Sequence, residues 1–261
     1  MESTTALDHT ESSIRYQSAT WDLDPRQTAL ILVDIWDTHI VRSHMERARQ
    51  IVRDGILPVL DAARKAGITA IHAPSAAVAA RHSPDRWADG LERVSAPPRT
   101  AVRGLRGVLS GIRSRSGRWP PASFRDRTGP YAIYARTPPS MWPGPKPPRD
   151  IPDSVRPLPG EPVIASGAQL HRLLRARRVL HLFYAGFATN VCVKDVHDYS
   201  MRTMHRRGYN LILLRDCTTG IENAETVDEL LLTRLAILEL EQSCASATAE
   251  AFLEGCARLC R

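Results

Sequence analysis

The feature that most constrains the fold is an alternation of short apolar runs with longer segments of helical periodicity. The runs are rich in branched and aromatic residues, which is typical of buried parallel strands. We expect strands at Thr28–Asp34, Ile68–Ala73, Pro162–Ala165, Val179–Ala185 and Asn210–Leu214, with a sixth near 243–247. Helices are expected at about 46–66, 167–178, 193–208 and 223–240 and at the C-terminus. This rhythm predicts an α/β fold with a doubly wound, mainly parallel sheet in the order 3-2-1-4-5-6.

The chain is long and apolar enough for one domain. It has 261 residues, 43% of them hydrophobic, and no break in composition requires a second core. Residues 1–20 are polar and lack periodicity, so we expect a flexible arm followed by a single domain over 21–261. Only the stretch at about 83–160 interrupts the rhythm. It is dense in proline, arginine and tryptophan, which is typical of a functional excursion or lid.

Composition also narrows the setting. The five cysteines, at positions 192, 217, 244, 256 and 260, form no CxxC pair, and the N-terminus has no apolar signal core. We therefore expect a cytoplasmic protein. No apolar run approaches the ~20 residues needed to cross a bilayer, so no membrane is expected. The net charge of +7 comes from scattered arginines without interleaved aromatic residues. That pattern favours a solvated surface over a nucleic-acid site, although attraction for an anionic substrate remains open.

One cysteine lies on a strand-to-helix elbow. The apolar run Val179–Ala185 leads into Gly186-Phe-Ala-Thr-Asn-Val-Cys192, and helical spacing follows until Gly208. Thr189 or Asn190 is expected to cap this helix and to place Cys192 in its first turn. A thiol there should ionise more easily than a free one. The alternative is that Cys192 is a small buried hydrophobe.

A carboxylate is expected near that thiol. Asp34 ends the first strand and Cys192 follows the fourth, and in the predicted order these two strands are neighbours at the topological switch point. Ligands bind in the crevice at this point of such sheets. Asp34 could instead serve as a helix cap or turn former, and only the opposing Cys192 argues against that role.

These residues carry a resemblance to a known family. The segments Leu32-Val-Asp34-Ile-Trp, Ala185-Gly-Phe-Ala-Thr-Asn-Val-Cys192-Val and Gly208–Asp216 resemble the isochorismatase-like cysteine hydrolase superfamily over roughly residues 27–250. That superfamily includes nicotinamidases, ureidoacrylate amidohydrolases and carbamoylsarcosine amidases. The resemblance implies a Rossmann-like, three-layer αβα fold with six strands, a homo-oligomer (dimer or tetramer), and hydrolysis of an amide-type C–N bond in a small molecule.

The resemblance also implies roles for single residues. Cys192 would be the nucleophile that forms an acyl-enzyme and Asp34 the base that takes its proton. The N–H groups of Ala188 and Cys192 would form the oxyanion hole, beside a cis peptide between Phe187 and Ala188. We expect the substrate pocket to be lined by Trp36, His39, Phe187, Thr189, Asn190 and Ser166. For Trp36 and His39 the alternatives are a packed indole and a solvent-facing imidazole.

No cofactor and no metal are expected. The Asp-x-His motif of nicotinamidases is absent, because the second strand ends in Ile71-His72-Ala-Pro-Ser75. His72 and His82 alone are a weak signal, since metal sites usually need more ligands.

The chain departs from the family at its third catalytic position. The usual lysine is missing and Ser166 stands in its place. A lysine would stabilise the thiolate and the developing oxyanion. A basic residue from elsewhere could replace it, and the candidates are His39, His171, Lys146 and an arginine between 99 and 136. Otherwise the enzyme uses a variant mechanism, or the site has lost its chemistry and the protein binds a small molecule without cleaving it.

Overall fold

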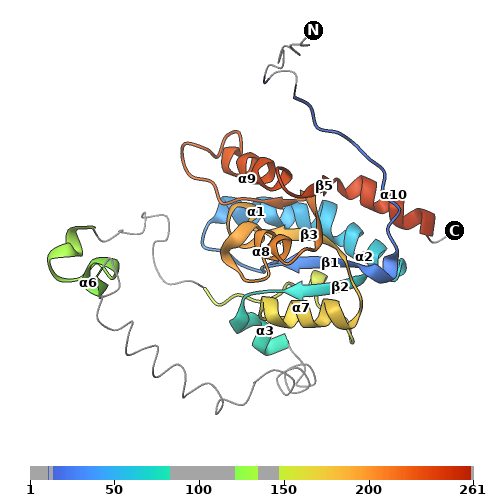
Figure 1. Cartoon of the computed structure of the whole chain (residues 1–261), viewed down its shortest axis with the longest axis horizontal. Coiled ribbons are helices and arrows are strands. Elements are labelled where there is room, and N and C mark those ends of the chain that lie inside the picture. The colour runs from blue at the N-terminus through green and yellow to red at the C-terminus, as the bar shows by residue number, and fades with distance from the viewer. Residues whose placement is uncertain (1–10, 12–13, 83–120, 135–146, 260–261) are drawn as a thin grey trace, which may run out of the picture.

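A parallel sheet of five strands forms the centre of the computed structural model, which describes residues 11, 14–82, 121–134 and 147–259 (Figure 1). The strands are β1 (Thr28–Val33), β2 (Thr69–Ala73), β3 (His181–Phe187), β4 (Asn210–Thr219) and β5 (Ala245–Ala247). They lie in the order β2-β1-β3-β4-β5 and every neighbouring pair is parallel. The prediction of a doubly wound α/β sheet is confirmed.

The expected strand at 162–165 is reduced to a single bridge. His72 of β2 pairs with Val163 in the parallel sense, so the segment lies at the sheet edge where the predicted order places it. Two hydrogen bonds make the contact, from His72 N to Pro162 O and from Ile164 N to His72 O, each 2.9 Å. Pro162 has no N–H to extend the ladder. The sheet therefore has five strands and one isolated bridge, where six strands were expected.

Helices cover both faces of the sheet. Their bounds are α1 (Arg42–Ile51), α2 (Leu57–Lys65), α3 (Ala76–His82), α6 (Ala122–Arg125), α7 (Gly167–Ala176), α8 (Met201–Arg206), α9 (Leu231–Glu241) and α10 (Ala249–Leu259). Two segments are π-helical, η3 (Val52–Ile56) and η6 (Thr189–Val196). Short 3₁₀ turns lie at η2 (Pro25–Gln27), η4 (Gly129–Tyr134) and η5 (Asp153–Val155).

Some expected helices differ from the observed ones. The segment expected at 46–66 consists of α1 and α2 joined by η3, and the helix expected at 223–240 begins only at Leu231. The helix expected at 193–208 divides into η6 and α8. Hydrophobic spacing cannot distinguish an α-helical from a π-helical segment, because the hydrogen bonds of the two helix types differ in span by only one residue.

Alternate residues of β1 supply two separate cores, which makes the fold three-layered. Leu30 and Leu32 pack with residues of α1, α2 and α10. Ala29, Ile31 and Val33 face the other way, toward residues of α7, α8 and α9. Because the central strand is buried on both faces, its sequence is a continuous apolar run.

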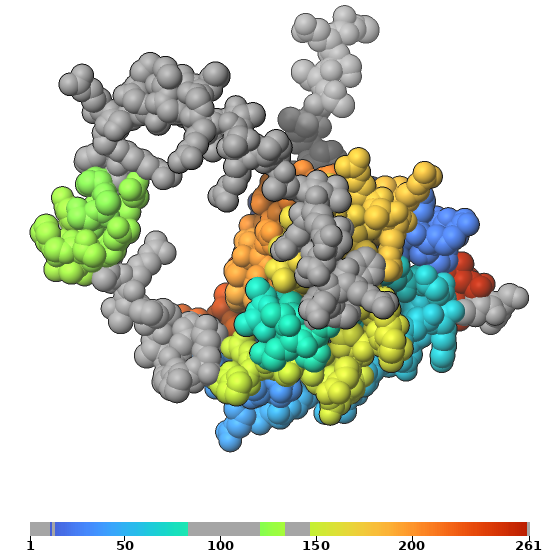
Figure 2. Space-filling view, turned by 90° about the horizontal axis from the view of Figure 1, so that it is seen from below, coloured from blue at the N-terminus to red at the C-terminus, as the bar shows by residue number. Residues whose placement is uncertain are grey.

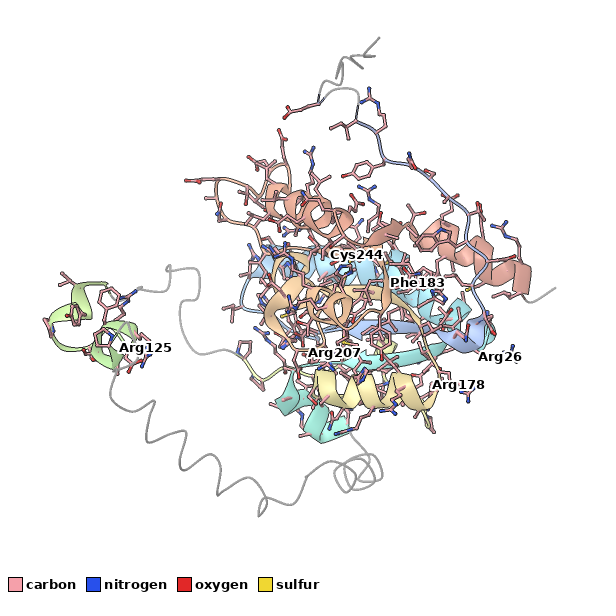
Figure 3. The ribbon with its side chains drawn as sticks, viewed as in Figure 1. Arg26, Arg125, Arg178, Phe183, Arg207 and Cys244 are labelled. Carbon is pink, nitrogen blue, oxygen red and sulfur yellow. The ribbon has the colours of Figure 1, made fainter. Side chains whose placement is uncertain are left out.

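The surface agrees with the expectation of scattered arginines. Arg26, Arg125, Arg178 and Arg207 are exposed at separate places in Figure 3. Figure 2 shows the face where α3 lies against the segment that begins at residue 147, and Arg81 and His82 of α3 both pair with Asp150 there. In the described part of the chain, no helix combines the length and apolar character needed to cross a membrane.

The expected excursion at 83–160 is described only in part, because residues 83–120 and 135–146 lie outside the described ranges. Most of the expected arm at 1–20 and Lys146 also lie outside the described ranges.

Candidate active site

Asp34 is held in a constrained position at the carboxyl end of β1. Its φ of 45° lies in the left-handed region, which is uncommon for a residue with a side chain. Its N–H donates to Ala73 O of β2 at 3.2 Å, and the residue is only 2% exposed. A carboxylate in a strained, buried position next to a strand end is a common feature of functional sites.

The elbow after β3 places Cys192 beside this carboxylate. The peptide bond between Phe187 and Ala188 is cis, as the resemblance implies. Helix η6 begins at Thr189, and its first turn holds Cys192. A thiol sulfur, a carboxylate oxygen and a ring nitrogen, from Cys192, Asp34 and His197, all lie within 4.8 Å of one another. The expected convergence of carboxylate and thiol is therefore present.

The Cys192 thiol is harder to ionise than expected from its helix position. Burial raises its pKa most, and the negative charge of Asp34 and a hydrogen bond to it raise the pKa further. The N–H of Ala188 and the charge of Arg149 oppose this and lower the pKa. The expectation of an easily ionised resting thiol is wrong, because desolvation outweighs the helix terminus. A thiolate therefore requires that the proton move to a nearby base.

His197 is the basic side chain that contacts Asp34. Its Nε2 lies 2.9 Å from Asp34 Oδ2. The other oxygen, Oδ1, is buried and has no hydrogen-bond partner among the described residues. That oxygen is the acceptor available for the proton of Cys192. A hydrogen bond to Asp34 also contributes to the raised pKa of the thiol, which places the two side chains in contact.

Ser166 and the elbow side chains make structural hydrogen bonds. Ser166 caps α7, where its Oγ accepts from Gln169 N at 3.3 Å. Thr189 shares a 2.7 Å hydrogen bond with Thr218, and Asn190 makes two bonds of 3.0 Å with the backbone of Ile221. Neither Thr189 nor Asn190 caps η6, whose N-cap is Ala188, so the capping expectation is wrong. Their role in substrate binding stays a prediction.

An aromatic cluster adjoins the site. Trp36 and His39 are both buried and stack with their ring centroids 5.1 Å apart. His44 contacts the His39 ring at 5.1 Å and the Phe187 ring at 6.1 Å, both edge-on. The structure thus brings together three residues expected to line the pocket, and His39 is not the solvent-facing imidazole of the alternative. Burial lowers the pKa of His44 to about 4, so its ring is neutral near pH 7.

Arg149 adds positive charge on this side. Its guanidinium carbon lies 4.6 Å from the centre of the Trp36 ring, a cation–π contact. Its charge lowers the pKa of both Cys192 and His44, so it acts on the thiol and the aromatic cluster together. Its Nε is buried and lacks a partner within the described ranges.

Two nitrogen-bearing side chains near the thiol were missed from the sequence. His197 and Arg149 were not among the candidates for the missing lysine, and one candidate, His171, instead contacts Tyr209 at 2.8 Å. His197 lies five residues after Cys192 in the sequence. In an α-helix that spacing places the two side chains on different faces, so the sequence offers no reason to select His197. Arg149 had no signal, because it lies in the irregular segment.

Only some of the described residues that could bind a metal ion lie close together. Among the described residues, Asp34, Cys192 and His197 form the one group with three ligand-type atoms close together. His72 and His82 lie apart from it, each against a carboxylate, that of Glu161 and that of Asp150. A metal ion bound by Asp34, Cys192 and His197 would be coordinated by the Cys192 sulfur. That the protein binds no metal stays a prediction.

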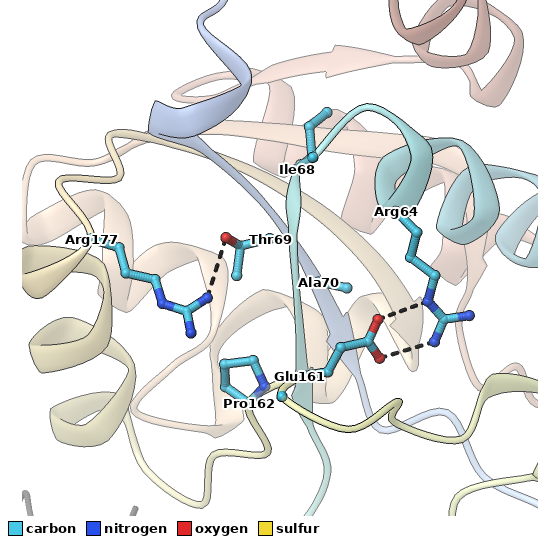
Figure 4. A pocket seen from close by; sticks show the side chains of 9 residues that line it. Arg64, Ile68, Thr69, Ala70, Glu161, Pro162 and Arg177 are labelled. Carbon is cyan, nitrogen blue, oxygen red and sulfur yellow. Dashed lines mark hydrogen bonds and ion pairs between the residues drawn. The ribbon is translucent and has the colours of Figure 1, made fainter. Parts of the chain in front are cut away.

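A pocket of about 210 Å³ lies at the opposite end of β2 (Figure 4). The Glu161 carboxylate is paired within the protein, because it accepts from Arg64 at 2.7 and 2.9 Å and contacts His72 at 3.0 Å. Arg177 donates to Thr69 Oγ1 at 3.4 Å. We interpret this region as an ion-pair network that ties the chain at 160–162 to α2 and β2.

Comparisons with known proteins agree with this geometry. A model of the Isochorismatase domain matches residues 114–248, more than half of the chain and including Cys192. A search of the curated proteins finds no match. A cysteine hydrolase from Pseudomonas syringae pv. phaseolicola 1448A has 16% identity and a TM-score of 0.55, covering 94% of this chain and 100% of its own. A structure described as a hydrolase of the isochorismatase family, from Chromobacterium violaceum ATCC 12472, has 18% identity and a TM-score of 0.50, covering 93% of this chain and 100% of its own. At these identities the likeness shows the fold.

Proposed function

Because the chain belongs to the Isochorismatase family, we propose that it is a cysteine hydrolase that cleaves an amide, ureido or related C–N bond of a small molecule. Cys192 is the nucleophile, Asp34 the base, and the backbone N–H groups of Ala188 and Cys192 the oxyanion hole. The observation that carries this proposal is the meeting of the thiol, the buried carboxylate and His197 within 4.8 Å at the switch point of the sheet.

The reaction begins with a proton transfer. Asp34 Oδ1 takes the proton of Cys192 Sγ, which removes the carboxylate charge that opposes ionisation of the thiol. The sulfur then attacks the carbonyl carbon, and the C=O electron pair moves to oxygen, where the N–H groups of Ala188 and Cys192 stabilise it. The N–H of Ala188 already acts on the sulfur in the resting site.

The intermediate then collapses and the C–N bond breaks. Asp34 returns its proton to the leaving nitrogen, which departs as an amine or ammonia, and an acyl group remains on Cys192 as a thioester. Asp34 next removes a proton from water, and the water oxygen attacks the thioester carbon. The C–S bond then breaks, the acid is released, and Asp34 returns its proton to Cys192 Sγ, which restores the resting site. The positive charge of Arg149 favours the anionic intermediates at each step, because it lowers the pKa of the thiol.

The test is covalent trapping. The protein is mixed with a panel of short aliphatic amides and N-carbamoyl amino acids, quenched in acid within seconds, and measured by intact mass and peptide mapping. We expect an acyl adduct on Cys192 that is absent from Cys192→Ala and strongly reduced in Asp34→Asn, with unchanged turnover in EDTA. Cys244→Ala is the matched control, because this half-buried cysteine lies away from the site. Turnover that survives Cys192→Ala, or that EDTA abolishes, contradicts the proposal.

A second candidate is a small-molecule-binding protein that keeps the pocket without the chemistry. The observation in its favour is the raised pKa of the Cys192 thiol. Under this alternative, members of the panel bind by calorimetry, but no adduct forms and no ammonia is released. A cytoplasmic location and a homo-oligomer stay predictions.

A further inference from the structure

His197 reaches Asp34 because the elbow helix is π-helical. In an α-helix, five residues span 1.4 turns, which would point His197 about 140° away from Cys192. A π-helix bonds residue i to residue i+5, so each turn takes more residues, and a residue five positions on returns toward the same side. The elbow helix η6 has this form, and His197 follows it directly. Val196, which an α-helix would place near Cys192, is 59% exposed.

The imidazole is held from two sides. The N–H of His197 donates to Ser200 Oγ at 2.9 Å, and that hydroxyl donates to Cys192 O at 2.6 Å. The ring stacks on Tyr199, with centroids 4.6 Å apart and planes 20° apart. Tyr199 is fixed in turn, because its hydroxyl donates to Pro74 O at 3.0 Å. The segment that carries the ring is therefore anchored both to the nucleophile's own backbone and to the loop after β2.

The contact with Asp34 fixes which atom does the chemistry. A carboxylate oxygen accepts hydrogen bonds, so in the contact with an ionised Asp34 the His197 Nε2–H is the donor to Oδ2. This bond fixes the rotation of the carboxyl group and leaves Oδ1 as the oxygen for the thiol proton. Ser166 is engaged elsewhere, because it caps α7 and its Oγ accepts from Gln169 N.

We propose that His197 is the positioning residue that holds the Asp34 carboxylate by a hydrogen bond to Oδ2. It does not take the proton from Cys192; it orients the group that does. This inference rests on the proposed function for its kinetic consequence. Its effect on the thiol needs no substrate.

The test uses three variants of the full-length chain and two readouts. His197→Ala removes the donor, His197→Lys restores a donor that carries no free lone pair at neutral pH, and His205→Ala is the control, an exposed histidine on α8. The first readout is the rate of alkylation of Cys192 by iodoacetamide at pH 7.5, followed by peptide mapping. The second is kcat and KM on an amide found in the panel. Thermal melts identify variants that fail to fold.

We expect His197→Ala to slow alkylation of Cys192 roughly tenfold, because a displaced Asp34 carboxylate no longer takes the thiol proton as the sulfur attacks. On a substrate it should lower kcat roughly 10²-fold with KM nearly unchanged, the lower end of what a positioned base contributes. His197→Lys should recover most of both losses, which a general base could not do because a protonated lysine accepts no proton. His205→Ala should match the wild type.

Two results overturn the inference. One is a folded His197→Ala whose Cys192 reacts with iodoacetamide at the wild-type rate. The other is a folded His197→Lys that is as slow as His197→Ala, since that would assign His197 a base or a purely structural role. If the wild-type protein acylates on no amide, the proposed function fails, while the alkylation series still decides the role of His197.

Discussion

Gly186 lets the backbone of β3 pack closely against that of β1. Its replacement by alanine tests whether this close packing positions Asp34. Gly186 lies beside Val33, the residue before Asp34. A Cβ added at Gly186 would lie 1.9 Å from Val33 O and less than 3 Å from two further backbone atoms of that residue. These atoms belong to the centre of the sheet, so the clash cannot be relieved by a side-chain rotation.

Two costs add for Gly186→Ala. Its φ of +120° is unfavourable for any residue with a side chain, at about 1–3 kcal/mol. Forcing a methyl group against packed backbone costs about 1–3 kcal/mol more. Together they amount to about 4 kcal/mol, a large part of the roughly 5–15 kcal/mol that stabilises a typical fold. For a chain of this size, that lowers Tm by roughly 12 °C.

Gly208→Ala is the matched control. Gly208 also has a positive φ, +88°, but an added Cβ would meet nothing within 4 Å. This variant therefore has only the backbone cost, about 2 kcal/mol or roughly 6 °C in Tm. Both are measured by thermal and urea unfolding, together with iodoacetamide alkylation of Cys192. Gly186→Ala alone should also change the alkylation rate, because it displaces β1 next to Asp34. Equal losses in the two variants would refute the close-approach argument.

Three further predictions follow from single contacts. Asn190→Ala should lower the unfolding free energy by about 2 kcal/mol in urea titrations, because two bonds to the loop after β4 are lost; an unchanged midpoint would contradict this. Glu161→Gln should lower stability at pH 7 but change it little below pH 2. Burial raises the pKa of Glu161, but hydrogen bonds from Arg64 and His72 outweigh it and lower the pKa from 4.5 to about 2, so the stabilisation is complete above about pH 4.5 and is lost as the pH falls through about 2. Arg149→Ala should slow alkylation of Cys192 roughly threefold to tenfold, because Arg149 lowers the pKa of that thiol; the exposed Arg156→Ala should not.

The sheet could be predicted from the sequence because its central strands are buried on both faces. Thr28–Val33 has no exposed residue, so the run is apolar throughout and its edges are clear. The segment at 162–165 misled the prediction, since it has the composition of a strand but begins with a proline that cannot donate to a ladder. Its place at the edge of β2 was still correct, because the order of strands follows from the crossover rule and not from the length of any one strand.

The pair Asp34 and Cys192 could be predicted for a related reason, since both follow central strands and the switch point brings such ends together. The state of the thiol could not. A position in the first turn of a helix favours ionisation, yet burial and the adjacent carboxylate raise the pKa of Cys192. Burial and the Asp34 charge both depend on groups that are distant in the sequence. Only the folded chain shows that together they outweigh the effect of the helix terminus.

The side chain that contacts the Asp34 carboxylate could not be predicted from the sequence. The prediction looked for a cation at the end of a strand, near Ser166, and that residue is engaged in capping α7. The contact to the carboxylate comes instead from the far end of the elbow helix, because a π-helical turn brings His197 back toward Cys192. One extra residue per turn is invisible to a hydrophobic pattern, but it changes which side chain faces the nucleophile. A search for relatives with the same departure should therefore look for a histidine five residues after the elbow cysteine, and not for a basic residue near the third strand.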